Sequence, residues 1–331
     1  MDVKPFTWQD GERIIRFGPG IAEEAVGVLG GPGYTLLTTA RAERMAAPVL
    51  AAAEDVVHVA PGPVDELAGE LLGALESDRL VALGGGRVVD VAKALAAASK
   101  GRTRAMAIPT TLSGAEMTRG HRQAVGAPEG TQGVRPAVVV NDPLLSASQP
   151  EPELAASALN ALGHAAEGPC TPRANPVATL AALEAARLLT GAFAPGGEPD
   201  RGALALGALL AGYTIDATLY GLHHVLAQTL VRLAGVGHGP ANAIMLPRTL
   251  PALGRRFPAW YERLGAAMGG DPADVALALT ARTGATRLGE LGVEPAQLDA
   301  CADAAAQRAE LQLTPPRADR EELRALYENA R

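Results

Sequence analysis

The chain has 331 residues, 48% of them hydrophobic, which favours two domains with sizeable cores over a single one. The formal net charge of −7 argues against nucleic acid as a partner, because nucleic-acid-binding proteins usually present a basic patch. Two cysteines are too few for a disulfide framework, and no signal peptide or bilayer-long apolar run stands out, so a cytoplasmic protein without a membrane partner is predicted.

Short apolar runs alternate with helical patterns over the first 145 or so residues. Strands are predicted over 34–39, 56–60, 80–85, 105–111 and 137–142, and helices over 40–54, 64–77 and 88–99. Because these strands are apolar throughout, they are typical of a parallel sheet that is covered on both faces.

After Pro150 the apolar period becomes helical. Helices are predicted over 152–168, 175–193, 201–235 and several stretches beyond 257, with breakers such as 194–202 between them. The predicted fold class is therefore an α/β domain over residues 1–148, followed by an all-helical domain over residues 149–331. The cleft between two such domains is the default place for a binding site.

The segment GGGRVVDVAK, residues 84–93, predicts a phosphate-binding loop. Gly84, Gly85 and Gly86 follow an apolar strand and open a helix, whose N–H groups and dipole favour an anion. One glycine would serve a tight turn, whereas three indicate a close approach of the backbone to another group. The spacing matches neither GxGxxG nor a Walker loop, and a plain strand-to-helix turn is the alternative.

A second segment, IPTTLSGAEMT at residues 108–118, carries hydroxyls where a strand ends. Thr110, Thr111 and Ser113 stand at the carboxyl end of a predicted parallel strand, where ligands bind in open α/β sheets. The alternative is a polar turn with side-chain capping.

Four of the six histidines in the chain lie between residues 164 and 238. His164 shares a helix face with Asn160 at spacing i, i+4, and His224 and His238 follow further along the chain. A single buried histidine is more often a satisfied core residue, but this group predicts a functional cluster that could bind a divalent metal.

Together these segments resemble the iron-containing (group III) alcohol dehydrogenase superfamily, and within it the maleylacetate reductase-like branch. The likeness covers most of the chain, with several motifs in the right order. It is carried by IIRFGPGIAEEAVGVLG (14–30), GGGRVVDVAKALA, PTTLSGAEMT, SALNALGHAAEG (157–168), HHVLAQTL (223–230), HGPANAIMLP (238–247) and LTPPRADREELRALYENA (313–330).

The resemblance implies a dehydroquinate synthase-like fold that binds NADH or NADPH. It implies that the nicotinamide side is lined by Thr110, Thr111 and Ser113. The remaining cofactor-binding positions that it implies are Gly84, Gly85, Gly86, Arg87, Asp90, Lys93 and Thr39.

Metal-dependent members of the family carry one Asp and three His ligands, and the matching positions here are Asn160, His164, His224 and His238. Asn160 removes the only anion of that set, so a bound Fe or Zn ion is left open. The maleylacetate reductases also have Asn there and resemble enzymes that can work without metal. In that interpretation the same four residues are catalytic, the histidines as proton donors or substrate clamps and Asn160 as a hydrogen-bond partner of the substrate oxygen.

Further departures from the family bear on substrate and cofactor. The reductases' HHKLCH is HHVLAQ here, so Val225 replaces a Lys and Gln228 a His, which weakens the case for a dicarboxylate. Arg87 replaces the usual Ser or Thr after the glycines. Thr39 stands where NAD-selective members place an Asp, and with Arg41 nearby it favours tolerance of the 2′-phosphate of NADPH.

The predicted function is that of an NAD(P)-dependent oxidoreductase, which transfers hydride between nicotinamide and a small carbonyl, enone or alcohol other than maleylacetate. A homodimer is expected from the resemblance. One alternative is a tailoring dehydrogenase acting on a peptide terminus in a bacterial natural-product pathway of the daptide-like kind. Another is a non-catalytic nucleotide-binding relative, which Asn160, Gln228 and Arg87 would motivate.

Overall fold

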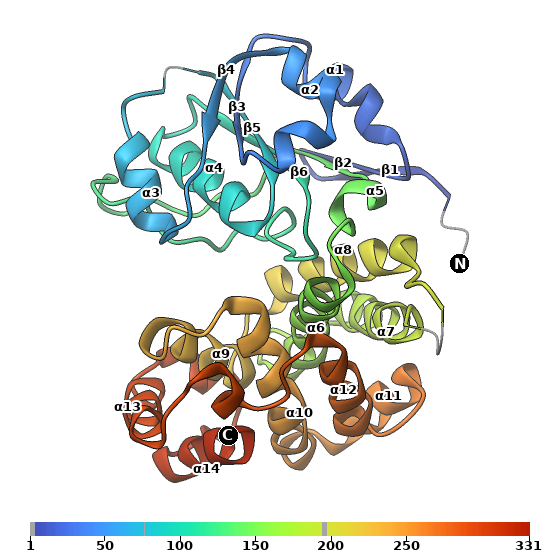
Figure 1. Cartoon of the computed structure of the whole chain (residues 1–331), viewed down its shortest axis with the longest axis vertical. Helices are drawn as coiled ribbons and strands as arrows, with labels where there is room; N and C mark the ends of the chain where they lie inside the picture. The colour runs from blue at the N-terminus through green and yellow to red at the C-terminus, as the bar shows by residue number, and fades with distance from the viewer. Residues whose placement is uncertain (1–3, 76, 194–196) are drawn as a thin grey trace. The chain divides into compact units, whose positions relative to one another are not determined.

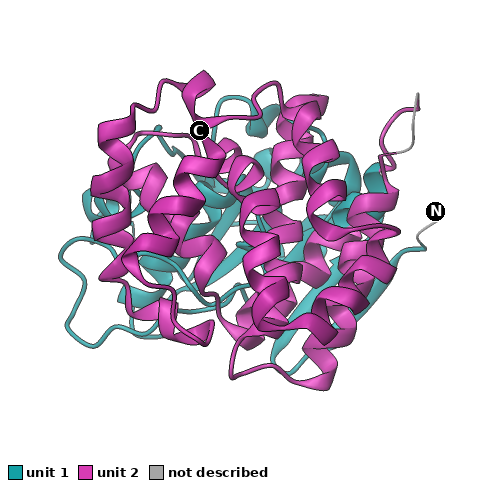
Figure 2. Ribbon diagram, turned by 90° about the horizontal axis from the view of Figure 1, so that it is seen from below, with its two compact units in different colours: residues 1–149, 201–205 teal, residues 150–200, 206–331 magenta. Residues whose placement is uncertain are grey.

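The computed structural model describes residues 4–75, 77–193 and 197–331 of the chain. They form two compact units, which Figure 2 colours separately. Unit 1 comprises residues 1–149 and 201–205, and unit 2 comprises residues 150–200 and 206–331. Unit 1 is an α/β structure, and the described part of unit 2 consists of helices and their connections, as the predicted fold class requires.

Unit 1 is built on a seven-stranded sheet of order β1-β2-β7-β6-β5-β3-β4, drawn in Figure 1. All neighbouring strands are parallel except β1 and β2, which pair antiparallel. The strands are β1 (Phe6–Asp10), β2 (Arg13–Phe17), β3 (Tyr34–Thr38), β4 (Ala53–His58), β5 (Arg79–Gly84), β6 (Arg104–Pro109) and β7 (Val138–Asn141).

Both faces of this sheet are buried, which explains why its central strands are apolar throughout. On β5, Leu80 and Ala82 pack on one face beneath α3 (Val64–Leu71) and α4 (Gly86–Ala98). Val81 and Leu83 point to the opposite face, which is covered by α1 (Ala25–Val28), α2 (Ala47–Ala51) and α5 (Pro143–Ser146). Alternation of side chains along a strand therefore places apolar residues in two separate cores.

Some boundaries in unit 1 differ from the prediction. The predicted helix over 40–54 is wrong, because that segment forms a 3-10 turn (Ala42–Met45), the short α2 and then the start of β4. Pro48 is the second residue of α2, a position that proline favours at the start of a helix but not in its interior. From Ala53 onward the chain pairs with β3 and belongs to the sheet. The predicted helix over 64–77 ends earlier, because Leu72 is extended and Gly73 has a φ of 82°.

Unit 2 is arranged around α10, which packs against α6, α9, α11, α12 and α14. Its helices are α6 (Glu151–Glu167), α7 (Pro176–Gly191), α8 (Arg201–Thr218, whose first five residues belong to unit 1), α9 (Leu222–Leu233), α10 (His238–Arg256), α11 (Pro258–Met268), α12 (Pro272–Thr280), α13 (Pro295–Ala306) and α14 (Arg320–Ala330).

The predicted helix over 201–235 is two helices, because α8 and α9 meet at a 101° bend. Leu219 takes a left-handed φ of 62° there, and a Cβ on Gly221 would lie 1.9 Å from the Oγ1 of Thr314. That hydroxyl accepts the N–H of Leu222 at 3.0 Å and so begins α9. Within the described ranges no single helix is long and apolar enough to cross a bilayer, and α8 and α9 reach that length only around the bend.

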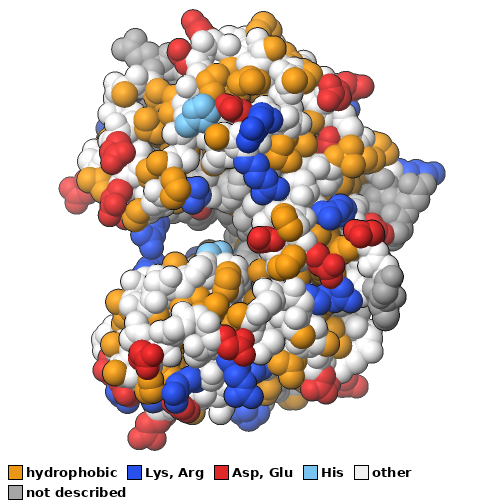
Figure 3. Space-filling model, in the orientation of Figure 1, with side chains coloured by type: hydrophobic (Ala, Val, Ile, Leu, Met, Phe, Trp, Pro, Cys, Tyr) orange, Lys and Arg blue, Asp and Glu red, His pale blue; other side chains and the backbone are white. Residues whose placement is uncertain are grey.

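Charged side chains of both signs are mixed on one face of the molecule. On the face shown in Figure 3, acidic and basic side chains lie interspersed, and the basic ones drawn in colour form no continuous stripe.

Candidate functional site

The carboxyl ends of three neighbouring strands in unit 1 carry the predicted cofactor residues. Thr39 directly follows β3, Thr110 directly follows β6, and Gly85 and Gly86 follow Gly84, which is the last residue of β5. These strands lie side by side in the order β6-β5-β3. Thr39 accepts the N–H of Ala42 at 3.2 Å, and the N–H of Thr110 donates to Gly84 at 2.9 Å. Parallel strands bring their carboxyl ends to one edge of the sheet, which is where open α/β sheets bind ligands.

We call residues 108–118 the hydroxyl segment. It packs so closely against Gly85 and Gly86 that a side chain at these positions would meet it. A Cβ on Gly85 would lie 3.0 Å from Cγ2 of Thr111, and a Cβ on Gly86 would lie 2.9 Å from Oγ of Ser113. The predicted close approach to the glycines therefore exists, and the protein's own threonine and serine make it. Gly85 and Gly86 remain partly exposed, and Arg87 is exposed at the start of α4.

Lys93 and Asp90 hold the hydroxyl segment onto α4. Lys93 is fully buried, and its Nζ donates to Asp90 Oδ1 at 2.8 Å, to the carbonyl of Ala115 at 3.0 Å and to that of Gly120 at 2.9 Å. From the β2 side, Arg13 donates to the carbonyl of Met117 at 3.1 Å. Two cations thus fix residues 115–120, and a direct contact of Lys93 or Asp90 with a cofactor stays a prediction.

In unit 2 the structure gathers histidines from α6 and α9. The rings of His164 and His224 stack with centroids 4.7 Å apart, and His223 meets His224 edge-on at 4.8 Å. Asn160 lies one turn before His164 on α6 and is buried. His238, the first residue of α10, is exposed.

Gly163 allows α6 to approach these rings. A Cβ at this position would lie 2.7 Å from Nε2 of His223 and 3.4 Å from Cε1 of His224. A larger residue would separate the two helices, so Gly163 belongs to the histidine cluster through packing.

Glu167 orients His224, and sequence reasoning missed it. Its carboxylate contacts Nδ1 of His224 at 2.9 Å, and the backbone N–H groups of His223 and His224 donate to it at 2.5 and 3.3 Å. A carboxylate that accepts two N–H groups is an acceptor toward the ring as well, so Nδ1 carries the proton and Nε2 offers its lone pair. The sequence held one signal, since Glu167 stands at i+3 from His164 in the segment HAAEG.

The imidazoles are uncharged at neutral pH. Burial, together with neighbouring imidazoles, lowers the pKa of His223 and of His224 to about 3. The same causes hold the pKa of His164 well below its usual value. Burial raises the pKa of Glu167, while the N–H groups that donate to its carboxylate oppose that rise.

The cluster does not fit a divalent metal in the arrangement seen here. Asn160 Oδ1, His164 Nδ1 and His224 Nε2 are buried atoms with no hydrogen-bond partner among the residues that the structure describes, which suits a ligand of some kind. However, no group of three or more His, Cys, Asp or Glu side chains in the described part of the chain could hold a metal ion. Nitrogen lone pairs lie in the ring plane, and the stacked rings of His164 and His224 are only 20° from parallel, so they do not converge on one ion.

A polar group from the C-terminal segment adjoins the histidines. The ring of Tyr220 lies 5.8 Å from that of His224, and Arg308 Nη2 donates to the Tyr220 hydroxyl at 3.3 Å. The same guanidinium group donates to Gln228 Oε1 at 3.1 Å and to Glu310 Oε1 at 2.6 Å. Gln228 therefore takes part in an Arg308 network that the sequence did not reveal, because its members are about 80 residues apart.

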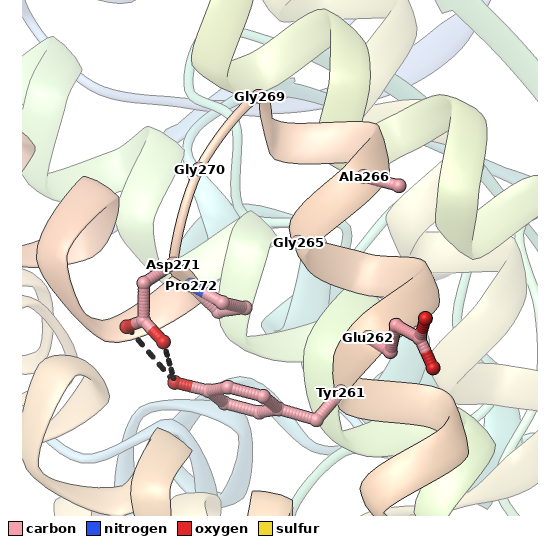
Figure 4. Close-up of a pocket in the computed structure, with 8 residues that line it drawn as sticks. All are labelled: Tyr261, Glu262, Gly265, Ala266, Gly269, Gly270, Asp271 and Pro272. Atoms are coloured by element: carbon pink, nitrogen blue, oxygen red, sulfur yellow. Dashed lines mark hydrogen bonds between the residues drawn. The ribbon is translucent and has the colours of Figure 1, made fainter.

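A shallow cavity of about 410 Å³ lies elsewhere in unit 2, between α11 and α12. Figure 4 shows that Tyr261 lines it, with its hydroxyl donating to Asp271 at 3.0 Å. None of the predicted site residues lines this cavity.

Comparisons with known proteins agree with the fold and with the resemblance seen in the sequence. Residues 154–331 match the Fe-containing alcohol dehydrogenase family, C-terminal. Maleylacetate reductase from Rhizobium sp. (strain MTP-10005) is 32% identical over 92% of each chain. Maleylacetate reductase 1 of Rhodococcus opacus is 34% identical over 75% of this chain and 71% of its own.

Solved structures give the same result. The crystal structure of maleylacetate reductase from Agrobacterium tumefaciens superposes with a TM-score of 0.82 at 27% identity, covering 99% of this chain and 98% of that one. The chain therefore belongs to the Fe-containing alcohol dehydrogenase family, in its maleylacetate reductase-like branch, and is an NAD(P)-dependent oxidoreductase.

Proposed function

We propose that unit 1 binds NADH or NADPH through the glycines, with the nicotinamide side of the cofactor at Thr110, Thr111 and Ser113. The observation that carries this proposal is the packing of Thr111 and Ser113 onto Gly85 and Gly86 at the carboxyl ends of adjacent parallel strands. The diphosphate would lie at the N-terminus of α4, a helix of 13 residues with no side-chain cap. Thr39, with no carboxylate at the end of β3, supports use of NADPH as well as NADH.

The reaction that we propose is hydride transfer between C4 of nicotinamide and a small carbonyl, enone or alcohol. In the direction of alcohol oxidation, the carbon gives a hydride to the oxidised nicotinamide and the oxygen gives a proton to Nε2 of His224. The Glu167 carboxylate then stabilises the imidazolium that forms, because Nδ1 of that ring faces it. In carbonyl reduction the same proton returns to the substrate oxygen as hydride reaches the carbon.

Asn160 and His164 are proposed to hold the substrate oxygen. Among the described residues, Asn160 Oδ1 and His164 Nδ1 are buried without a partner. Asn160 Oδ1 can accept the proton of an alcohol hydroxyl. His164 Nδ1, where it carries the ring proton, can donate to the oxygen as negative charge develops, which lowers the barrier to hydride transfer. No step requires a metal ion, in keeping with the stacked arrangement of His164 and His224.

The substrate is proposed to be a small carbonyl or alcohol other than maleylacetate. Val225 is fully buried in the core, and the guanidinium group of Arg308 is paired with Glu310, so the histidine cluster offers no unpaired cation from these two positions to a dicarboxylate. Comparison of kcat/KM for maleylacetate and for uncharged aldehydes tests this part. The terminus of a peptide is an alternative substrate for the same hydride transfer.

Measurement of nucleotide binding tests whether the glycines bind the cofactor, on which the rest of the proposal depends. Gly86→Ala places a methyl group 2.9 Å from Ser113 Oγ and pushes the hydroxyl segment away from the loop, so NADPH affinity is expected to fall at least about tenfold. Titration that follows the fluorescence of NADH and NADPH measures it. Gly27→Ala in α1 is the matched control, because a Cβ there meets nothing within 4 Å. Failure of the wild-type chain to bind either nucleotide, or unchanged affinity in Gly86→Ala, would overturn the proposal.

A further inference from the structure

A second cavity opens in unit 1 at the amino ends of β2, β5, β6 and β7. Its volume is about 580 Å³, within the usual range of small-molecule sites. Ile14, Met106 and Val138 supply apolar lining, and each belongs to a different strand or the start of one. The proposed cofactor residues stand at the opposite ends of these strands.

The lining of this cavity is basic. Arg79, Arg102 and Arg104 line it, and Asp78 is the one acidic residue among its lining residues. With three arginines and one aspartate, the lining carries a net charge of +2 (3 − 1), in a chain whose net charge is −7. Such a hollow raises the local concentration of anions.

The three arginines differ in what they are free to bind. Arg79 donates to the carbonyls of Leu29 and Gly31 at 3.0 and 2.9 Å and lies 3.6 Å from Asp78, so its N–H groups are largely used. In contrast, the side chains of Arg102 and Arg104 make no ion pair or hydrogen bond with any described residue. Both are exposed, and their guanidinium groups remain available to a ligand.

The backbone holds these two arginines in place. The N–H of Arg104 donates to the carbonyl of Asp78 at 2.8 Å, and Thr103 Oγ1 donates to the carbonyl of Ser77 at 2.8 Å. The turn before them is tight, with left-handed φ values of 55° at Lys100 and 86° at Gly101. Lys100 has a side chain and still adopts that conformation, a strain that surrounding structure must support.

We propose that this cavity binds a small anion with at least two negatively charged oxygens, a phosphate group or a di- or tricarboxylate, through Arg102 and Arg104. Planar guanidinium groups bind such oxygens in a bidentate manner. The site is separate from the glycine loop, because Arg79 and Gly84 are the two ends of β5 and lie roughly 17 Å apart at about 3.3 Å per residue.

The experiment measures the melting temperature of the full chain against inorganic phosphate, pyrophosphate and citrate, at constant ionic strength set with KCl. A ligand that binds only the folded chain raises the melting temperature in a saturable way. The test variant is Arg102→Gln with Arg104→Gln. The control is Arg44→Gln with Arg287→Gln, which removes the same charge at two exposed arginines elsewhere.

The expected result is a saturable rise in the wild-type chain and in the control, with apparent affinity at least about tenfold weaker in the Arg102/Arg104 variant. The anion that saturates at the lowest concentration separates a phosphate ligand from a carboxylate ligand. The same response in all three proteins would place the anion elsewhere and overturn the proposal, as would no response to any of the three anions up to 10 mM. Because the comparison uses no nicotinamide cofactor, its outcome is independent of the proposed hydride transfer.

Discussion

His224 owes its chemical state to residues distant in sequence. Glu167 lies at the end of α6 and contacts both the backbone and the Nδ1 of His224 on α9. The contact orients the ring and leaves Nε2 free of Glu167, as the atom that we propose exchanges the proton with the substrate. A histidine held by a carboxylate in this way is the arrangement that general acid–base catalysis needs.

Glu167→Gln tests that role. Glutamine has nearly the same volume, but only one of its two terminal side-chain atoms can accept the N–H hydrogen bonds that both carboxylate oxygens of Glu167 accept. It also carries no charge to stabilise an imidazolium. We expect kcat to fall by roughly 10- to 100-fold, measured by NADPH oxidation with the best carbonyl substrate, while NADPH affinity stays unchanged. Glu184→Gln, which removes an exposed partner of Arg187, serves as the control and should retain full activity. Equal kcat in both variants would show that Glu167 is structural only.

At the level of single residues, the helical spacing of site residues could be predicted from the sequence, whereas their contacts with distant segments could not. The i, i+4 spacing of Asn160 and His164 places both on one face of α6, as the helical period requires. The partnership of Gln228 with Arg308 was not predictable, because hydrogen bonds between distant segments leave no periodic signal.

Among the elements, the break between α8 and α9 shows how packing overrides helical propensity. Residues 201–235 read as one helical stretch, yet Gly221 packs against Thr314 so closely that no side chain fits. The hydroxyl of Thr314 satisfies the N–H of Leu222, which would otherwise be an orphan at the start of α9.

Gly221→Ala is expected to lower the free energy of unfolding by about 2 kcal/mol or more, because the new methyl group would overlap Thr314 Oγ1. Urea denaturation followed by circular dichroism measures the change. Gly191→Ala at the end of α7 is the control, since a Cβ there meets nothing within 4 Å, and its effect should be within about 1 kcal/mol. A Gly221→Ala chain as stable as the control would contradict the packing argument.

For the whole molecule, the buried titratable groups determine how stability depends on pH. The folded chain keeps His164, His223 and His224 neutral, whereas the unfolded chain protonates them near pH 6.5. These histidines therefore destabilise the fold as the pH falls below 6.5. Glu116, whose pKa burial raises to about 7, acts in the opposite direction between pH 4.5 and 7, because the folded chain binds its proton more tightly. Burial also raises the pKa of Glu167, which therefore acts in the same direction as Glu116 above pH 4.5.

The expected result is a small change in stability between pH 7 and 5 and a steep loss between pH 4.5 and 3. In the upper range the glutamates largely offset the histidines. In the lower range the histidines act together with Glu310, whose pKa Arg308 lowers to about 2. Arginine partners also lower the pKa of Glu184, Glu322 and Glu328. All of these groups favour the unfolded chain on acidification. Urea midpoints at half-unit steps of pH measure this. A midpoint that falls mainly above pH 5.5, or stays constant down to pH 3.5, would contradict it.

The homodimer and the cytoplasmic location stay predictions, as do the domain limits 1–148 and 149–331 as functional units.

The sequence by itself determined the class of the fold. Apolar strands such as 80–85 and the helical period after Pro150 are local patterns, and local patterns follow from the side-chain periods of strands and helices.

Only the tertiary structure decided which residues meet. Lys93 is hydrogen-bonded to the hydroxyl segment, Glu167 to His224 and Arg308 to Gln228. β1 forms the edge of the sheet. The tertiary structure also divided residues 201–235 into two helices. The physical reason is that these outcomes depend on contacts between segments far apart in the chain, and the energy of such contacts outweighs local preference.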